Sequence, residues 1–219
     1  MLIRFILVLL CVLIISHSAI TQNLRFGSGV IAGINLAQVD GDDMQGYDKS
    51  GLNFGLRGIA FILPKLEIQT ELTYSQQGSQ SKSFKQEIHN GRKLYVDYGG
   101  VTGLIAINDW YHPIKEFYRF QLIGGVSLKR LIRSDYYDGI RSDTRKVNFK
   151  DVSPYFSTTD FSMILGANFK LTPKAGLSFR YNRSFNYLLD SEAVQQYFER
   201  KQIISMKQYF LSADVFYQF

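Results

Sequence analysis

The 219-residue sequence predicts an all-β fold, an eight-stranded antiparallel transmembrane β-barrel with four long extracellular loops and short periplasmic turns. Eight segments alternate apolar and polar residues with a period of two, which is typical of strands between lipid and a polar interior. The connections between these segments are alternately long and short. The last segment is a strand that stops on an aromatic residue, Phe219.

The strand-like segments, in chain order, cover roughly residues 26–39, 52–63, 65–77, 92–108, 118–134, 161–171, 175–188 and 207–219. Most are long enough for a tilted crossing, which takes about 9–11 residues. The third segment alternates most clearly, with Leu72 on the apolar face and Glu71 on the polar face. The sixth and seventh alternate in the same way. The fourth is less regular at Gly99 and Gly100, a pair that favours a β-bulge.

The lengths of the connections indicate on which side of the membrane each one lies. Three connections are short (64, 109–117 and 172–174), and four are long and polar (40–51, 78–91, 135–160 and 189–206). Short turns are periplasmic in outer-membrane barrels, so an even number of strands places both termini in the periplasm. Residues 191–201 have helical character and predict a short helix in the last loop. Two soluble folds are alternatives, a lipocalin-like barrel and a β-sandwich. In either one, the apolar face of each strand would point inward.

The N-terminal residues predict export. Arg4 is the only charge before an apolar run over residues 5–15, which is followed by small residues. This order matches a signal peptide. We expect it to cover residues 1–21, with cleavage near residues 18–22 and the barrel over residues 22–219. The alternative, an N-terminal membrane anchor, needs about 20 apolar residues. Cys11, the only cysteine, lies in this segment, so the mature chain would have neither disulfides nor thiol catalysis.

Two stretches resemble a known family. The sequence VIAGINLAQVDGDD (30–43) followed by QGYDKSGL (45–52), and the hairpin LPKLEIQTELTYSQQG (63–78), are similar to the PorT-like outer-membrane β-barrel family of Bacteroidetes. The final strand is similar as well. The resemblance implies an outer-membrane barrel and links the chain to secretion machinery, which the family's namesake serves. It implies no catalytic residue and no cofactor.

Charged residues on the polar faces of the predicted strands are the main site candidates. They are Arg57, Glu67, Glu71, Asp97, Lys129, Lys170, Arg180 and Asp214. The interior of an eight-stranded barrel is just filled by side chains. An unpaired charge buried there would be costly, so we expect ion pairs that close the lumen. The alternative is a narrow gated pore in which these pairs exchange partners.

Several other residues are of the types used for metal binding, catalysis and lipid contact. Asp40–Asp43 has the carboxylate density of a Ca²⁺ site but lacks the spacing of a calcium loop, which favours a solvated turn. His89 and His112 lie on connections at opposite membrane faces, so they cannot share a metal. His89 lies near Ser79, Ser81 and Ser83 in sequence but has no nucleophile motif. Basic residues of the third loop and its root either hold lipid phosphates or are solvated: Arg130, Arg133, Arg141, Arg145 and Lys146.

The C-terminal aromatics Tyr217 and Phe219 resemble the assembly signal of outer-membrane barrels. We therefore expect deletion of Phe219 to impair insertion more than the stability of the folded barrel. The expected partners are outer-membrane lipid and lipopolysaccharide, the barrel-assembly machinery during biogenesis, and an unidentified envelope protein. Nucleic acid is not expected, because the net charge of +6 is scattered along an exported chain.

The predicted function is that of a non-enzymatic outer-membrane protein, a structural or interaction subunit of the envelope with no cofactor or metal. Two alternatives stay open, a small-solute channel and a lipid-modifying enzyme.

Overall fold

The computed structural model describes residues 25–42, 44, 46–82, 91–138, 153–190, 192 and 205–219. These residues form one antiparallel sheet of eight strands and a single turn of 3-10 helix, η2 (Ser153–Tyr155). The strands are β1 (Phe26–Asp40), β2 (Lys49–Leu63), β3 (Leu66–Gln80), β4 (Arg92–His112), β5 (Phe117–Asp138), β6 (Thr159–Lys170), β7 (Ala175–Ser184) and β8 (Lys207–Gln218). The predicted signal peptide lies outside the described residues, as does the predicted helix over 191–201 apart from Glu192.

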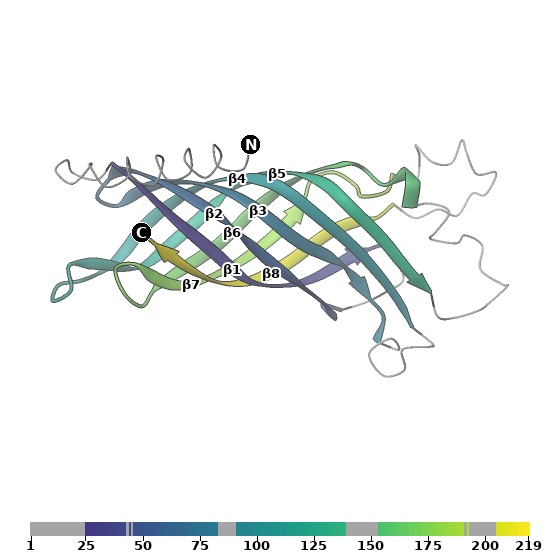
Figure 1. The fold of residues 1–219 in the computed structure, drawn as a ribbon, viewed down its shortest axis with the longest axis horizontal. Helices are drawn as coiled ribbons and strands as arrows, with labels where there is room; N and C mark the ends of the chain where they lie inside the picture. The colour runs from purple at the N-terminus through teal and green to yellow at the C-terminus, as the bar shows by residue number, and fades with distance from the viewer. Residues whose placement is uncertain are drawn as a thin grey trace, which may run out of the picture.

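Each strand pairs with the next, and β8 pairs with β1 from Gly29↔Gln218 to Asp40↔Lys207. The sheet therefore closes into a barrel with no free edge, as a membrane interior requires. Figure 1 shows the strands tilted against the long axis of the barrel. The C-terminus lies at the same end as the short turns, called here the short-turn end. The opposite end, which carries the long connections, is called the long-loop end. The predicted fold class is confirmed.

Some strand limits differ from the prediction. β4 and β5 continue their pairing to His112↔Phe117, so the turn between them is only residues 113–116. β7 ends at Ser184, earlier than predicted, because the chain then bends and Leu188 pairs with Met206 through a 2.8 Å backbone hydrogen bond. Among the described residues, no helix is long and apolar enough to cross a membrane.

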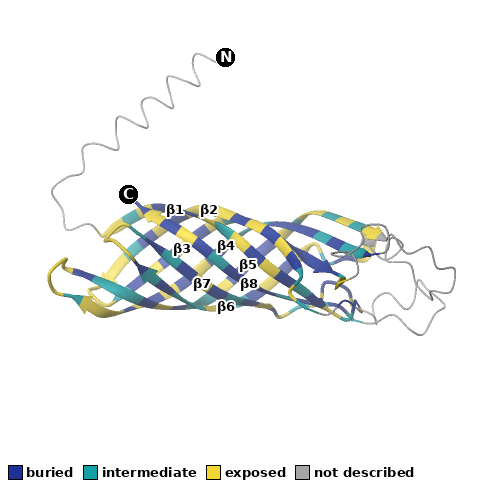
Figure 2. Ribbon diagram, turned by 90° about the horizontal axis from the view of Figure 1, so that it is seen from below, coloured by how far each residue is buried: buried dark blue, intermediate teal, exposed yellow. Residues whose placement is uncertain are grey.

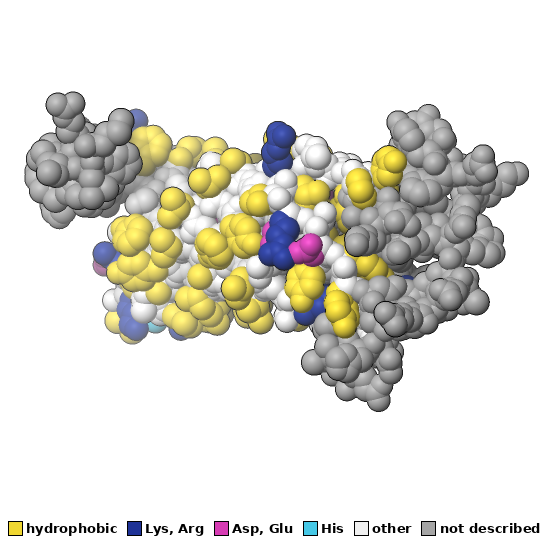
Figure 3. All heavy atoms as spheres, turned by 45° about the vertical axis from the view of Figure 1, so that its right-hand side comes forward, with side chains coloured by type: hydrophobic (Ala, Val, Ile, Leu, Met, Phe, Trp, Pro, Cys, Tyr) yellow, Lys and Arg dark blue, Asp and Glu magenta, His cyan; other side chains and the backbone are white. Residues whose placement is uncertain are grey.

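Residues of the two parities face opposite sides of the wall, as the checkered burial pattern in Figure 2 shows. Leu72 and Val215 are each 58% exposed, whereas their neighbours Glu71 and Asp214 are 0% and 3% exposed. Figure 3 shows hydrophobic side chains spread over the outer wall of the barrel. An apolar exterior around a polar interior suits a lipid environment. The soluble alternatives, which need the apolar parity inside, are therefore wrong.

The irregularity predicted at Gly99 and Gly100 has a specific form. Asp97 pairs with Arg133, but the next residue, Tyr98, pairs with Leu131. The extra residue is thus Ile132 on β5, and the bulge lies on the partner strand instead of at the glycine pair. Such a bulge adds twist to the strand that carries it.

Candidate functional site in the barrel lumen

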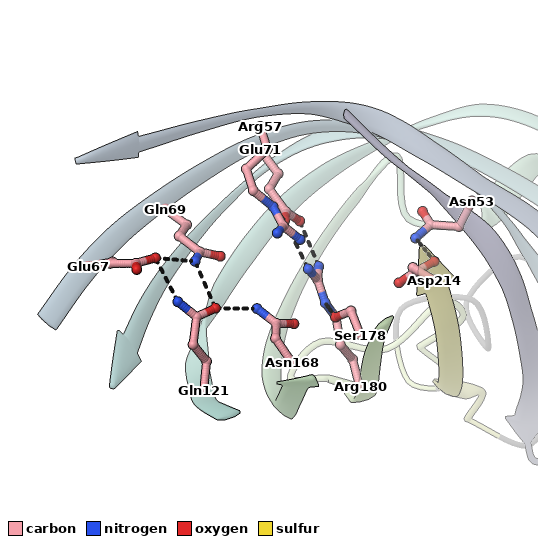
Figure 4. A network of polar contacts seen from close by, with 10 residues as sticks. All are labelled: Asn53, Arg57, Glu67, Gln69, Glu71, Gln121, Asn168, Ser178, Arg180 and Asp214. Atoms are coloured by element: carbon pink, nitrogen blue, oxygen red, sulfur yellow. Dashed lines mark hydrogen bonds and ion pairs between the residues drawn. The ribbon is translucent and has the colours of Figure 1, made fainter. Parts of the chain in front are cut away.

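The centre of the lumen is crossed by a three-residue ion cluster. Glu71 on β3 accepts hydrogen bonds from Arg57 on the neighbouring β2 (Nε to Oε1, 2.8 Å) and from Arg180 on β7. The Arg180 bonds are bidentate, from Nη1 to Oε2 at 2.6 Å and from Nη2 to Oε1 at 2.9 Å. Strands β3 and β7 are four places apart in the ring of eight, so this pair spans the barrel (Figure 4). The geometry is that of a strong fork-to-carboxylate interaction.

Two aromatic residues, Phe210 and Phe216, lie on the otherwise polar face of β8 and are buried inside the barrel. Phe216 is 1% exposed, and the guanidinium carbon of Arg57 lies 4.8 Å from the centre of its ring. A cation above an aromatic face is attracted by the ring quadrupole. Phe216 therefore adds a cation–π contact to the hydrogen bond that Arg57 makes with Glu71.

A second polar layer lies towards the short-turn end. Glu67 accepts hydrogen bonds from Asn108 (2.9 Å) and Gln121 (2.7 Å), and it lies 3.5 Å from the Lys170 amine. Asn168 donates to the Gln121 side-chain oxygen at 2.9 Å. These residues come from β3, β4, β5 and β6, so the layer links four strands. Figure 4 shows three of its members, Glu67, Gln121 and Asn168. Sequence reasoning named Glu67 and Lys170 but missed the three amides.

The remaining predicted lumen residues have different environments. Lys129 pairs with Asp160 at 3.2 Å, and Asp214 accepts a 2.9 Å hydrogen bond from Asn53. Asp97 is buried, but it points to the opposite side of β4 from the lumen-facing Val96 and Tyr98 and forms no ion pair among the described residues. The prediction that it belongs to the lumen charges is therefore wrong. Asp160 was missed because the polar third loop was expected to extend to that residue.

Little free space remains beside the ion cluster. A cavity of about 20 Å³ is lined by Glu71, Arg180, Lys129, Asn182 and other polar side chains. This volume is enough for roughly one water molecule. The polar half of the lumen is thus filled by side chains of opposite charge and by amides.

The long-loop end of the lumen is closed by a hydrophobic group, called here the mouth cluster. It consists of Val39, Met44, Leu94, Val96, Tyr98, Phe156, Leu188, Leu189 and Met206, with Leu131 and Tyr136 packed against it. The loop backbones that supply it are joined by 2.8 Å hydrogen bonds from Ser157 N–H to Leu188 O and from Leu188 N–H to Met206 O. The mouth cluster was not predicted, because several of its members lie in stretches interpreted as polar loops.

Other sequence candidates are dispersed. His112 stacks on Phe117 with ring centres 5.9 Å apart, at the short-turn end. Arg130 is exposed, and Arg133 pairs with Asp135 on the outside of β5. In the part of the chain that the structure describes, no group of three or more His, Cys, Asp or Glu side chains forms a metal site. The candidates outside the described residues are Asp43, Ser83, His89, Arg141, Arg145 and Lys146.

Comparison with known proteins identifies the family. The family model for the outer membrane protein beta-barrel domain matches residues 7–219. The chain belongs to this family. Membership and the closed eight-stranded barrel together place the protein in the outer membrane. No curated protein matches the chain.

Solved outer-membrane barrels are similar to this family member in fold. Ail of Yersinia pestis, in complex with the heparin analogue sucrose octasulfate, is 13% identical, with a TM-score of 0.45, covering 89% of this chain and 100% of that one. Neisserial surface protein A is 11% identical, with a TM-score of 0.47 and coverages of 89% and 97%. The N-terminal barrel domain of Pseudomonas aeruginosa OprF is 10% identical, with a TM-score of 0.41 and coverages of 88% and 99%.

Asp42 connects the first long loop of this outer-membrane barrel to the mouth cluster. Its side chain is 1% exposed and accepts a 2.8 Å hydrogen bond from the Met44 amide, in the turn that carries Met44 into the cluster. Burial raises the pKa of Asp42 to about 6, while the nearby Ser79 hydroxyl, Met44 amide and Arg92 guanidinium oppose that rise. Asp42 is thus buried and bonded to the turn backbone, so the solvated turn expected at Asp40–Asp43 is wrong for this residue.

We expect Asp42 to make the folded protein less stable as the pH rises through about 6. The pKa in the folded state lies above that of the unfolded chain, about 3.9. The stabilisation is therefore fully present below about pH 4 and lost as the pH rises through the folded pKa. Asp42→Asn retains the hydrogen-bond acceptor for the Met44 amide but cannot titrate. The urea midpoint of this variant should therefore depend less on pH between pH 4 and 7.5 than that of the wild type. An exposed control, Asp109→Asn, should follow the wild type. An unchanged profile in Asp42→Asn would contradict the assignment.

Proposed function

We propose that the protein is a non-enzymatic outer-membrane subunit whose barrel is a closed anchor and whose long-loop end binds another envelope protein. The observation that carries this proposal is closure of the lumen at two levels. The Glu71–Arg180 pair spans its centre, and the mouth cluster fills its long-loop end. Because packed side chains fill the interior of this barrel, its function is carried by the outer surface and the loops.

Several finer assignments support this role and belong to the same proposal. The resemblance to PorT-like barrels of Bacteroidetes favours a partner in a secretion machinery. An exported chain needs a signal peptide, which we assign to residues 1–21. Lipopolysaccharide is the proposed lipid partner at the long-loop end. Tyr217 and Phe219, which are 45% and 70% exposed at the short-turn end, are proposed as the signal read by the barrel-assembly machinery.

The partner role is tested by site-specific photo-crosslinking in intact cells, with the reactive side chain at Tyr155 of the long-loop end. Tyr155 is 40% exposed. We expect a protein adduct of defined mass at this position. The matched control is Ile114 at the opposite end, 88% exposed, where we expect no such adduct. Identical adduct patterns at both positions, or none at Tyr155, would contradict a partner at the long-loop end.

One observation favours a second candidate, a small-solute channel. Arg57 Nη1 and Nη2 and Asp214 Oδ2 are buried without a hydrogen-bond partner in the described structure. Together with the 20 Å³ cavity, these atoms offer alternative partners if the central pairs exchange. Electrical recording separates the two candidates. The lipid-modifying enzyme is favoured by no arrangement among the described residues.

A further inference from the structure

An arginine is held between two aromatic rings at the rim of the short-turn end. The guanidinium carbon of Arg119 on β5 lies 5.6 Å from the ring centre of Trp110 on β4 and 5.6 Å from that of Phe169 on β6. The two rings contact each other edge to face at 6.1 Å. Three adjacent strands thus contribute one side chain each to a small cationic site.

The backbone at Trp110 departs from the regular strand. Its φ of 51° lies in the left-handed region, which is unfavourable for a bulky residue. Trp110 shares its parity with the buried Asn108, yet its side chain is 59% exposed and contacts Phe169 on the outer parity of β6. The Trp110 amide donates to Asp109 Oδ1 at 2.8 Å, which fixes this turn. The strained conformation therefore brings the indole to Arg119 and the outer wall.

The charge of Arg119 is not neutralised within the described structure. No carboxylate of the described residues lies within ion-pair distance, and the Arg119 Nε is enclosed without a hydrogen-bond partner. The turns on either side carry the exposed residues Lys115 and Lys174. Two exposed acids, Asp109 on β4 and Glu116 in the turn before β5, lie in the same region, but neither forms an ion pair with Arg119. The rim accordingly favours an anion.

The wall next to the site is apolar. Ile107, Leu122 and Leu171 are between 50% and 56% exposed on strands β4 and β5 and just after β6. A ligand that meets both surfaces has an anionic head and hydrocarbon chains. A planar guanidinium matches the geometry of phosphate oxygens, and aromatic rings are typical of the membrane interface.

We propose that Arg119, Trp110 and Phe169 bind the phosphate of a glycerophospholipid in the leaflet at the short-turn end. The guanidinium binds the phosphate diester, and the acyl chains lie along the apolar wall. The site rests on the outer-membrane location of the barrel and is independent of the partner-binding role.

The only tryptophan of the chain belongs to this site, so its fluorescence reports on binding directly. The full-length protein in detergent micelles is titrated with a short-chain phosphatidylglycerol while Trp110 emission is recorded. We expect a saturable change in the wild type and at least tenfold weaker binding in Arg119→Gln. The matched control is Arg183→Gln, which removes an exposed arginine of β7 far from the short-turn end and should bind as the wild type does.

Two further arms make the result decisive. Inorganic phosphate at the same concentrations should give no saturable response. An equal response would show a general anion site and overturn the lipid assignment. Arg119→Lys keeps the positive charge but lacks the planar guanidinium that can donate two hydrogen bonds to a phosphate. It should therefore bind more weakly than the wild type. The heat-dependent gel mobility of each variant reports whether it is folded. Equal affinity in wild type, folded Arg119→Gln and folded Arg119→Lys would overturn the proposal.

Discussion

Replacement of Glu71 by alanine is expected to lower the free energy of unfolding by about 3–5 kcal/mol, because it leaves buried cations without their partner. Arg57 and Arg180 both bind the Glu71 carboxylate, and both are at most 5% exposed. Neither can reach bulk water by a simple change of rotamer in a filled lumen. The loss should appear in urea unfolding of the protein in lipid vesicles, followed by Trp110 fluorescence.

The matched control removes a carboxylate from an ion pair on the outside of the barrel. Asp135 pairs with Arg133, but their side chains are 53% and 66% exposed. Exposed pairs contribute little because water solvates both partners. Asp135→Ala should therefore unfold at the wild-type urea concentration. If Glu71→Ala also unfolded at the wild-type urea concentration, the central cluster would not stabilise the barrel.

Replacement of Gly125 by alanine is expected to cost about 1–3 kcal/mol or to prevent folding, since it overpacks a close strand contact. A Cβ at this lumen-facing position of β5 would lie 2.0 Å from the carbonyl oxygen of Gly103 and 2.9 Å from the Cα of Leu104. These are backbone atoms of β4 and cannot move aside without disturbing the ladder. Only a residue without a Cβ permits this approach.

Gly103→Ala is the control, because a Cβ at Gly103 has no heavy atom within 4 Å. The two glycines lie on neighbouring strands, so the variants differ mainly in the direction of the added methyl group. Heat-modified gel mobility and urea midpoints should show a destabilised Gly125→Ala and a near-normal Gly103→Ala. Similar stability of the two variants would contradict the close strand contact.

The sequence was sufficient to predict the barrel because strand periodicity is a local property. The alternation of Glu71 and Leu72 is visible without any knowledge of their partners. Closure then follows from the even number of strands and the lipid environment. The lumen charges were found by the same parity argument, and most of them lie inside the barrel.

The partners of these charges could not be predicted, since they depend on the stagger of strands around the ring. Arg180 reaches Glu71 across the barrel because the stagger of β3 and β7 brings them to the same height. Asp160 was predicted to end a polar loop, because the residues before it are polar, whereas it is the second residue of β6. The mouth cluster needs Phe156, Leu188 and Met206, which come together only when two long loops fold back. Trp110 lies in a stretch predicted as a turn, and the left-handed backbone that directs its side chain could not be predicted from the sequence.

Single-channel recording of the purified protein in planar bilayers tests the central claim, that the lumen is closed, most directly. A general porin reconstituted in the same way provides the positive control for insertion. We expect the wild type to insert without unitary current steps at any moderate voltage, because the Glu71–Arg180 pair and the mouth cluster block the path in series. Stable steps of uniform size from the pure protein would contradict a closed lumen and favour the small-solute channel.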